Sequence, residues 1–193
     1  MLRSIGSNKI NTAVFISGNG SNLRSLLKFS KLKKSPICIK LIISNKSKAK
    51  GLRLAKIFKI QKKTLNFFDH SLAEKKILSE LKKKKIKLIC LAGFMKILSK
   101  NFITNFNGKI LNIHPSLLPK YKGLDTHKRV IDNKEKYSGC TVHFVNSKLD
   151  SGKIIIQKKI KISKNETAQS LAKKILIYEH KIYPKAILKV FNH

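Results

Sequence analysis

The chain has 193 residues, 42% of them hydrophobic, and its 43 lysines and arginines against nine acidic residues give a formal net charge of +34. The length predicts a single domain over residues 1–193, and the hydrophobic content excludes an intrinsically disordered chain. All but four of the basic residues are lysines spread along the whole chain, which disfavours a dedicated nucleic-acid binder, since such proteins use arginine forks and stacking aromatics.

The first part of the chain alternates short apolar runs with amphipathic stretches. The apolar runs predict strands over residues 10–17, 37–44, 86–93 and 109–114. The amphipathic stretches predict helices over residues 21–31, 48–58 and 71–85. We expect the helix over residues 71–85 to be capped near Ser71, with Glu74 three residues on, as in a capping box. This order predicts an α/β protein with a Rossmann-like, mostly parallel twisted sheet and helices on both faces.

The later part of the chain has a different pattern. Strand-like runs over 139–146 and 152–162 are joined by the turn SKLDSG, which predicts an antiparallel C-terminal addition to the sheet. The tail from 165 to about 190 predicts one long helix with a break near Pro184, because proline cannot donate a backbone hydrogen bond.

Cysteine usage and the N-terminal pattern bear on the cellular compartment. Cys38, Cys90 and Cys140 are far apart and form no CxxC pair, which predicts buried free thiols in a reducing compartment. The apolar run TAVFIS is too short for a signal-peptide core or a membrane span. We therefore expect a cytoplasmic protein that does not enter the membrane.

A glycine-containing turn, VFISGNGSNLRSLL, separates the first predicted strand from the first helix. Gly20 permits a tight turn, Ser21 and Asn22 can cap the helix, and the helix start favours an anion. A dinucleotide site requires a third glycine and an acid about 20 residues on, but position 23 is Leu23 and the first acid is Asp69. The turn therefore predicts a site for a small sugar phosphate, with a plain strand-to-helix turn as the alternative.

The run KILNIHPSLLPKYKG places two polar side chains at the end of a predicted strand. Asn112 and His114 share one face because side chains alternate along a strand. An amide beside an imidazole can polarise a carbonyl and move a proton, which is the chemistry of acyl transfer to an amine. Asp150, in the turn KLDSG, could orient the ring and favour its protonated form. The alternative is a structural histidine that merely ends a strand.

Two rival sites use the same histidine. A Ser116–His114–Asp150 triad would lack the GxSxG turn on which such a serine usually sits. A metal site is disfavoured because no close ligand pair occurs at helical or CxxC spacing. Its four candidate ligands are His114, His127, His143 and Asp150.

Four motifs resemble one family in order and spacing: ISGNGSNL, LAGFMKILS, LNIHPSLLPKYKGLDTH and VHFV followed by LDSG. Together they resemble the phosphoribosylglycinamide formyltransferases of the folate-dependent formyltransferase superfamily. The resemblance implies the formyltransferase fold and transfer of a formyl group from 10-formyltetrahydrofolate to glycinamide ribonucleotide. It implies direct attack through a tetrahedral intermediate, small-molecule substrates and no metal.

The resemblance also implies a role for individual residues. Asn112 holds the formyl oxygen, His114 donates a proton to the tetrahedral oxyanion, and Asp150 raises the pKa of that histidine and relays a proton. Glu179 contacts the glycinamide substrate. The implied phosphate-binding residues are Gly20, Ser21 and Asn22. The implied folate-binding residues are Met95, Lys96, Ile97, Leu98, Asn112, Asn146, Ser147, Lys148, Leu149 and Asp150.

Three alternatives remain beside this reaction. Methionyl-tRNA formylation would suit the positive charge, but that enzyme is expected to carry a further C-terminal domain for which 193 residues leave no room. Hydrolysis of formyltetrahydrofolate usually comes with an extra N-terminal domain. A basic nucleic-acid-binding module would leave Asn112, His114 and Asp150 scattered, whereas an enzyme would bring them into one pocket.

Overall fold

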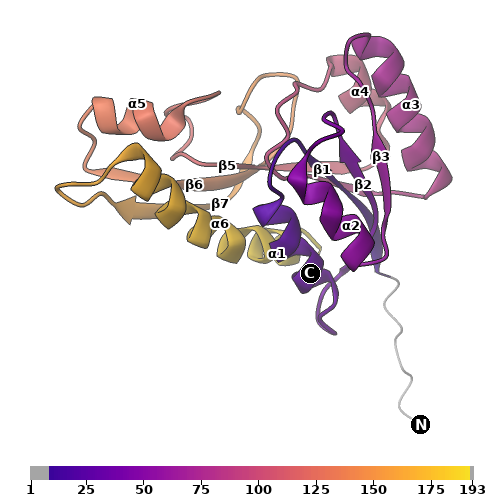
Figure 1. Ribbon diagram of the computed structural model, residues 1–193, viewed down its shortest axis with the longest axis horizontal. Helices are drawn as coiled ribbons and strands as arrows, with labels where there is room; N and C mark the ends of the chain where they lie inside the picture. The colour runs from indigo at the N-terminus through magenta and orange to yellow at the C-terminus, as the bar shows by residue number, and fades with distance from the viewer. Residues whose placement is uncertain (1–8, 192–193) are drawn as a thin grey trace.

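The computed structural model describes residues 9–191 of the chain. Seven strands form one sheet in the order β3-β2-β1-β4-β5-β6-β7 (Figure 1). The strands are β1 (Ile10–Ile16), β2 (Ile37–Ser44), β3 (Gln61–Thr64), β4 (Leu88–Leu91), β5 (Lys109–His114), β6 (Tyr137–Phe144) and β7 (Ile154–Lys161). Neighbours from β3 to β5 are parallel, whereas β6 is antiparallel to β5 and β7 to β6. The predicted mostly parallel sheet with an antiparallel addition is confirmed.

Helices cover both faces of this sheet. They are α1 (Ser21–Ser30), α2 (Arg53–Ile57), α3 (His70–Lys83), α4 (Lys100–Asn105), α5 (Thr126–Asp132) and α6 (Ala168–Phe191), with a 3₁₀ turn, η1, at Lys50–Leu52. Alternation along β1 separates the two faces. Val14 and Ile16 join a core with α1, α2 and α6, and Ala13 and Phe15 join a second core with α3 and α4.

The strand order creates a natural ligand site. The chain moves outward from β1 to β2 and β3, then crosses back to β4 on the other side of β1. Open α/β sheets bind ligands at the carboxyl ends of strands at such a reversal. The connections that follow β1, β4 and β5 all leave the sheet at this edge, so their residues are available to build one site.

Several local predictions were inaccurate. The helix expected over 48–58 is the turn η1 followed by the short α2, and β3, α4 and α5 were not predicted. Helix α3 is capped by Asp69, whose side chain accepts from the backbone N–H of Leu72 at 2.9 Å. Glu74 does not complete a capping box, because its carboxylate accepts from the backbone N–H of Ser99 at 2.8 Å. Glu74 therefore links α3 to the start of α4.

Helix α6 continues through Pro184 without the predicted break. Proline cannot donate to the carbonyl four residues earlier, which belongs to His180. That carbonyl accepts instead from the Ser25 hydroxyl of α1 at 3.0 Å. The neighbouring helix thus supplies the missing donor, and local sequence alone could not reveal it.

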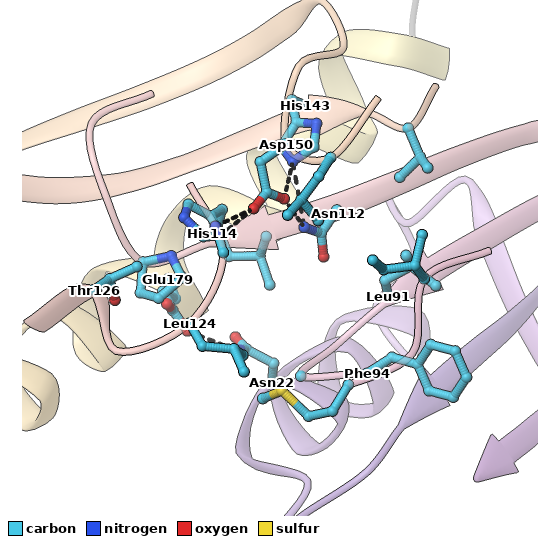
Figure 2. Close-up of a pocket in the computed structure, with 18 of the residues that line it drawn as sticks. Asn22, Leu91, Phe94, Asn112, His114, Leu124, Thr126, His143, Asp150 and Glu179 are labelled. Carbon is cyan, nitrogen blue, oxygen red and sulfur yellow. Dashed lines mark hydrogen bonds and ion pairs between the residues drawn. The ribbon is translucent and has the colours of Figure 1, made fainter. Parts of the chain in front are cut away.

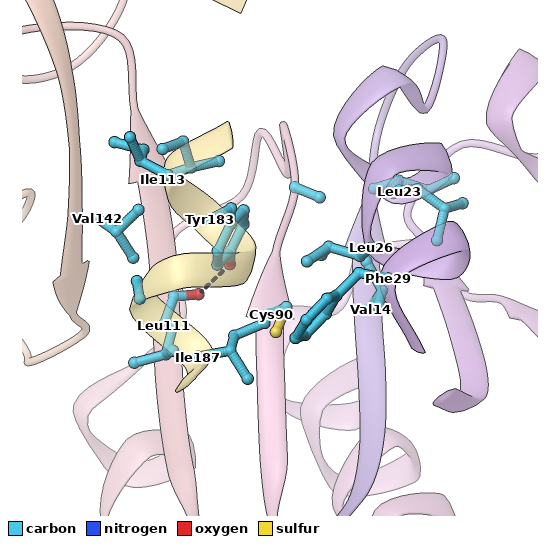
Figure 3. Packing of buried hydrophobic residues seen from close by; sticks show 14 of the residues in the cluster. Val14, Leu23, Leu26, Phe29, Cys90, Leu111, Ile113, Val142, Tyr183 and Ile187 are labelled. Carbon is cyan, nitrogen blue, oxygen red and sulfur yellow. Dashed lines mark hydrogen bonds between the residues drawn. The ribbon is translucent and has the colours of Figure 1, made fainter. Parts of the chain in front are cut away.

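Tyr183 attaches α6 to the centre of the sheet. It is fully buried, and its hydroxyl lies 3.0 Å from the carbonyl oxygens of both Leu91 in β4 and Leu111 in β5. Figure 3 shows its ring among the aliphatic side chains of this core, near the thiol of Cys90. Since Glu179 precedes Tyr183 by one helical turn, this attachment also fixes Glu179 relative to the strand ends.

The three cysteines are free, as predicted, and Cys90 and Cys140 are buried while Cys38 is partly exposed. Burial raises the pKa of the Cys90 thiol to about 12, against a smaller opposing effect of Tyr183.

Within residues 9–191, no helix combines the length and apolarity needed to cross a membrane.

Candidate active site

A cavity of about 740 Å³ opens at the carboxyl ends of β4 and β5. Its walls come from the first turn of α1, the loop after β4, the end of β5, the start of α5, the loop between β6 and β7, and α6. Asn112, His114 and Asp150 all line this cavity. The structure therefore brings the three predicted catalytic residues into one pocket.

Asp150 makes the central contacts of this group. Its backbone is in the left-handed region, with φ 45°, and its Oδ2 lies 3.3 Å from His114 Nδ1. The same oxygen accepts from the backbone N–H of Gly123 at 2.9 Å. Asp150 Oδ1 lies 3.4 Å from the side-chain nitrogen of Asn112. Figure 2 shows the carboxylate between the imidazole and the amide.

A fourth member, His143, was named from sequence only as a possible metal ligand. It lies on β6 directly opposite Asn112, and its Nε2 is 3.3 Å from the Asn112 side-chain nitrogen and 3.6 Å from Asp150 Oδ1. Its Nδ1 lies 2.8 Å from the carbonyl oxygen of Phe144, which places the proton of the neutral ring on Nδ1. We refer to Asn112, His114, His143 and Asp150 as the His–Asp cluster.

Burial and charge act in opposite directions on the two key groups. Burial lowers the pKa of His114, and the Tyr121 carbonyl, 2.8 Å from its Nε2, and Asp150 raise it by less. Asp150 acts on this pKa in the predicted direction, but burial outweighs it. Burial raises the pKa of Asp150, but contacts with His143, the Gly123 N–H and His114 together lower it by more. The net shift of this pKa is downward. Burial therefore makes the imidazolium of His114 a stronger acid, whereas the contacts of Asp150 favour its ionised carboxylate.

A second polar group lines the same cavity below the His–Asp cluster in Figure 2. Asn22 of α1 donates from its side-chain nitrogen to Glu179 Oε2 of α6 at 2.6 Å, and both residues are more than 90% buried. The Asn22 side-chain oxygen has no hydrogen-bond partner within residues 9–191. Burial raises the pKa of Glu179 more than the Asn22 hydrogen bond lowers it. We refer to Asn22 and Glu179 as the acid–amide pair.

The glycine turn differs from its predicted form. Gly20, with φ 76°, is the N-cap of α1 and provides no side chain, so the expected capping by Ser21 or Asn22 is wrong. A Cβ at position 20 would lie 2.7 Å from the Cα of Gly51, so packing between two loops requires this glycine. Asn22 lines the cavity, whereas Gly20 and Ser21 lie outside its wall at the adjoining helix start.

The predicted folate-binding segments both line the cavity. The segment over 95–98 follows β4, and the segment over 146–150 lies between β6 and β7. Met95, Ile97 and Leu149 are at least half exposed, at 59%, 63% and 50%. Exposed apolar side chains that line a cavity favour a partly apolar ligand.

The rival sites lack support from the geometry. Ser116 is fully buried, and its hydroxyl donates to the carbonyl of Lys120 at 2.7 Å, so it is not presented to the cavity. Among the described residues 9–191, no three side chains of histidine, cysteine, aspartate or glutamate are grouped to hold a metal ion.

Comparison with known proteins gives a consistent result. The family model described as formyl transferase matches residues 10–187. The chain is 38% identical over 181 residues to phosphoribosylglycinamide formyltransferase of Escherichia coli strain K12, covering 92% of this chain and 85% of that protein. A crystal structure of phosphoribosylglycinamide formyltransferase from Brucella melitensis has a TM-score of 0.89 at 39% identity, covering 95% of this chain and 96% of that one.

Longer proteins match as well. The chain is 39% identical over 192 residues to the trifunctional purine biosynthetic protein adenosine-3 of Bos taurus, covering 95% of this chain but only 18% of that protein. It therefore spans about a fifth of the length of such multifunctional relatives. The family match over nearly the whole chain, and the identity to a bacterial protein of similar length, lead to one conclusion: this chain belongs to the formyl transferase family.

Proposed function

We propose that this protein transfers the formyl group of 10-formyltetrahydrofolate to the amine of glycinamide ribonucleotide, a step of de novo purine biosynthesis. The observation that carries the proposal is the contact between His114 Nδ1 and Asp150 Oδ2 at 3.3 Å, beside Asn112, in the cavity of a formyl transferase. The names of its bacterial relatives support the same acceptor.

The folate cosubstrate is expected to enter between the two apolar segments. The cavity of about 740 Å³ suits a drug-sized ligand, and Met95, Ile97 and Leu149 offer apolar surface at its mouth. Bound there, 10-formyltetrahydrofolate supplies an activated formyl group on a nitrogen that can leave. The remaining wall residues of this proposed subsite are Lys96, Leu98, Asn146, Ser147 and Lys148.

The chemistry proposed for the His–Asp cluster begins with attack of the substrate amine on the formyl carbon. The Asn112 side-chain nitrogen would donate to the formyl oxygen. Its present contacts of 3.3 and 3.4 Å are long, so a well-placed oxygen at about 2.9 Å would compete with them. Such donors aimed at a developing oxyanion commonly contribute a factor of about 100 or more to the rate.

The proton inventory of the proposed reaction balances. The protonated His114 donates to the oxyanion of the tetrahedral intermediate, and the lowered pKa of His114 makes that imidazolium a stronger acid. Collapse of the intermediate returns this proton as the amide carbonyl forms and the bond to the folate nitrogen breaks. The proton lost by the amine is relayed by Asp150 through water to the leaving nitrogen.

Recognition of the ribonucleotide is assigned to the acid–amide pair and the glycine turn. Glu179 and the unpartnered Asn22 oxygen offer acceptors for the N–H and hydroxyl groups of the substrate. The phosphate is proposed to lie at the start of α1, at Gly20 and Ser21, where a helix N-terminus favours an anion. The net charge of +34 would attract such a substrate without a nucleic-acid partner.

Acceptor specificity tests the proposal directly. The purified chain is incubated with 10-formyltetrahydrofolate and either glycinamide ribonucleotide, methionyl-tRNA or water alone, and formyl transfer is measured. We expect transfer to the ribonucleotide only. Transfer to tRNA, or none to the ribonucleotide by folded protein, would reject the assignment.

A cytoplasmic location is part of the proposal and fits the three free thiols.

A further inference from the structure

The segment over residues 121–125, at the end of the connection from β5 to α5, contacts two of the proposed catalytic residues. The carbonyl oxygen of Tyr121 lies 2.8 Å from His114 Nε2. The backbone N–H of Gly123 donates to Asp150 Oδ2 at 2.9 Å. The position of this segment therefore affects both partners of the contact between His114 and Asp150.

The backbone conformation of the segment is unfavourable by itself. Tyr121 and Asp125 have φ angles of 57° and 55°, in the left-handed region that residues other than glycine rarely adopt. Such conformations persist where the surrounding structure holds them in place. The segment therefore depends on contacts with other parts of the chain to keep its shape.

Arg129 of α5 supplies such contacts. Its guanidinium nitrogen Nη1 donates to the carbonyl oxygens of Lys122 at 2.7 Å and Leu124 at 3.2 Å. The guanidinium carbon also lies 5.4 Å from the centre of the Tyr121 ring, where a cation is attracted to the face of an aromatic ring. Arg129 therefore holds the segment on both sides of Gly123.

The residue type at position 129 is informative, because only four of the 43 basic residues are arginines. A lysine would carry the same charge, but its ammonium would end one bond short of Nη1 and would lack the planar fork of N–H groups. Arg129 is exposed and lies outside the cavity wall, so it is not placed to contact a bound substrate. An effect of Arg129 on the reaction would therefore act through the segment.

We propose that Arg129 is a positioning residue, which holds the segment over 121–125 and, through it, the pair of His114 and Asp150. Without the guanidinium, the Tyr121 carbonyl and the Gly123 N–H would no longer be fixed against this pair. Displacements of about 1 Å in catalytic geometry can cost about 100-fold in rate. The expected effect on turnover rests on the proposed function, whereas the expected effect on the segment does not.

Three variants separate this role from the effect of charge and from general damage. Arg129→Ala removes the guanidinium, and Arg129→Lys keeps the charge but shortens the reach. Lys128→Ala is the matched control, because Lys128 precedes Arg129 in α5, is exposed and lies outside the cavity wall.

The backbone amide of Gly123 reports on the segment without an assay of the reaction. Its hydrogen exchange is measured by NMR in the full-length protein. We expect exchange to be about tenfold faster in Arg129→Ala and in Arg129→Lys, and to change by less than about twofold in Lys128→Ala. Unchanged exchange in Arg129→Ala would overturn the proposal. Unchanged exchange in Arg129→Lys would also overturn it, because a cation alone would then be sufficient.

Turnover tests the link from the segment to the catalytic pair. The kcat for formyl transfer to glycinamide ribonucleotide should fall about tenfold in Arg129→Ala and less than about twofold in Lys128→Ala. In a His114→Ala background, Arg129→Ala should lower kcat by less than about twofold, because the pair is already disabled. An equal loss in both backgrounds would indicate a merely structural role and overturn the proposal, as would an unchanged kcat in Arg129→Ala. If the unmodified protein transfers no formyl group, the proposed function fails and the exchange of the Gly123 amide decides whether Arg129 holds the segment.

Discussion

The His–Asp cluster and the acid–amide pair line one cavity but compensate buried charge differently. Asp150 receives contacts from two imidazoles, one amide and one backbone N–H, and its pKa is lowered. Among residues 9–191, Glu179 has the single hydrogen-bond partner Asn22, and its pKa is raised. A buried carboxylate thus stays ionised where several donors converge and gains a proton more readily where one donor is present.

This difference indicates a division of labour. The His–Asp cluster combines a stable negative charge with a titratable ring, which suits proton movement during a reaction. The acid–amide pair combines a carboxylate with an unpartnered amide oxygen, which suits hydrogen bonding to a bound molecule. Variants in the two groups should therefore affect different kinetic constants.

The largest effect is expected from His114→Ala. In the proposed reaction His114 protonates the oxyanion, so its removal should lower kcat by at least about 100-fold while the KM for the ribonucleotide changes little. Steady-state kinetics of formyl transfer measure both constants. His180→Gln is the control, because His180 lies outside the cavity wall and should leave turnover near normal. A near-normal rate in His114→Ala would remove this histidine from the mechanism.

A different signature is expected from Glu179→Gln. Removing the carboxylate should raise the KM for the ribonucleotide about tenfold and change kcat by less than about threefold, since one hydrogen bond to a charged group is lost. The same assay applies, with Glu166→Gln as the matched control, because Glu166 precedes α6 and lies outside the cavity wall. A loss confined to kcat would mean that the acid–amide pair takes part in chemistry, and the division of labour would fail.

The sequence could predict the parts of the site that depend on short-range geometry. Asn112 and His114 share a face because they are two residues apart on a strand, and the strand end places them at the ligand edge. The sheet class followed from the alternation of apolar runs and amphipathic stretches. Local spacing also made Asp150 noticeable as one of only nine acids, in a glycine turn.

The parts that sequence reasoning missed depend on contacts between distant segments. His143 faces Asn112 only because β6 pairs with β5 in one antiparallel register. Asn22 contacts Glu179 across 157 residues rather than capping its own helix. The continuity of α6 at Pro184 depends on Ser25. No local pattern encodes these partners, although the motif VHFV could have drawn attention to His143.

A smaller effect is expected from Ser25→Ala, which tests the contact between α1 and the helix that carries Glu179. The variant leaves the His180 carbonyl without its donor and should lower the free energy of unfolding by about 1 kcal/mol. Urea denaturation measures this loss. In a Pro184→Ala background, the backbone N–H of residue 184 can donate to the His180 carbonyl. Ser25→Ala should therefore lower the free energy of unfolding by less in that background. Equal costs in both backgrounds would contradict the account of the proline.

The smallest effect concerns pH and stability. Burial lowers the pKa of His180 below 6.5, so the unfolded chain takes up this proton before the folded chain does. The associated stability is present above pH 6.5 and is lost as pH falls toward the folded-state pKa. The melting temperature should therefore drop more between pH 7.5 and 5.5 in the unmodified protein than in His180→Gln. Equal drops in melting temperature for the two proteins would show that folding does not lower the pKa of His180.

The coupling between His114 and Asp150 tests the account most directly. If the two residues act as one unit, the kcat of the double variant His114→Ala, Asp150→Asn should be no more than about threefold below that of the slower single variant, because the first change already disables the unit. Steady-state turnover with glycinamide ribonucleotide measures all three. Multiplication of the two single effects in the double variant would show independent action and contradict the account.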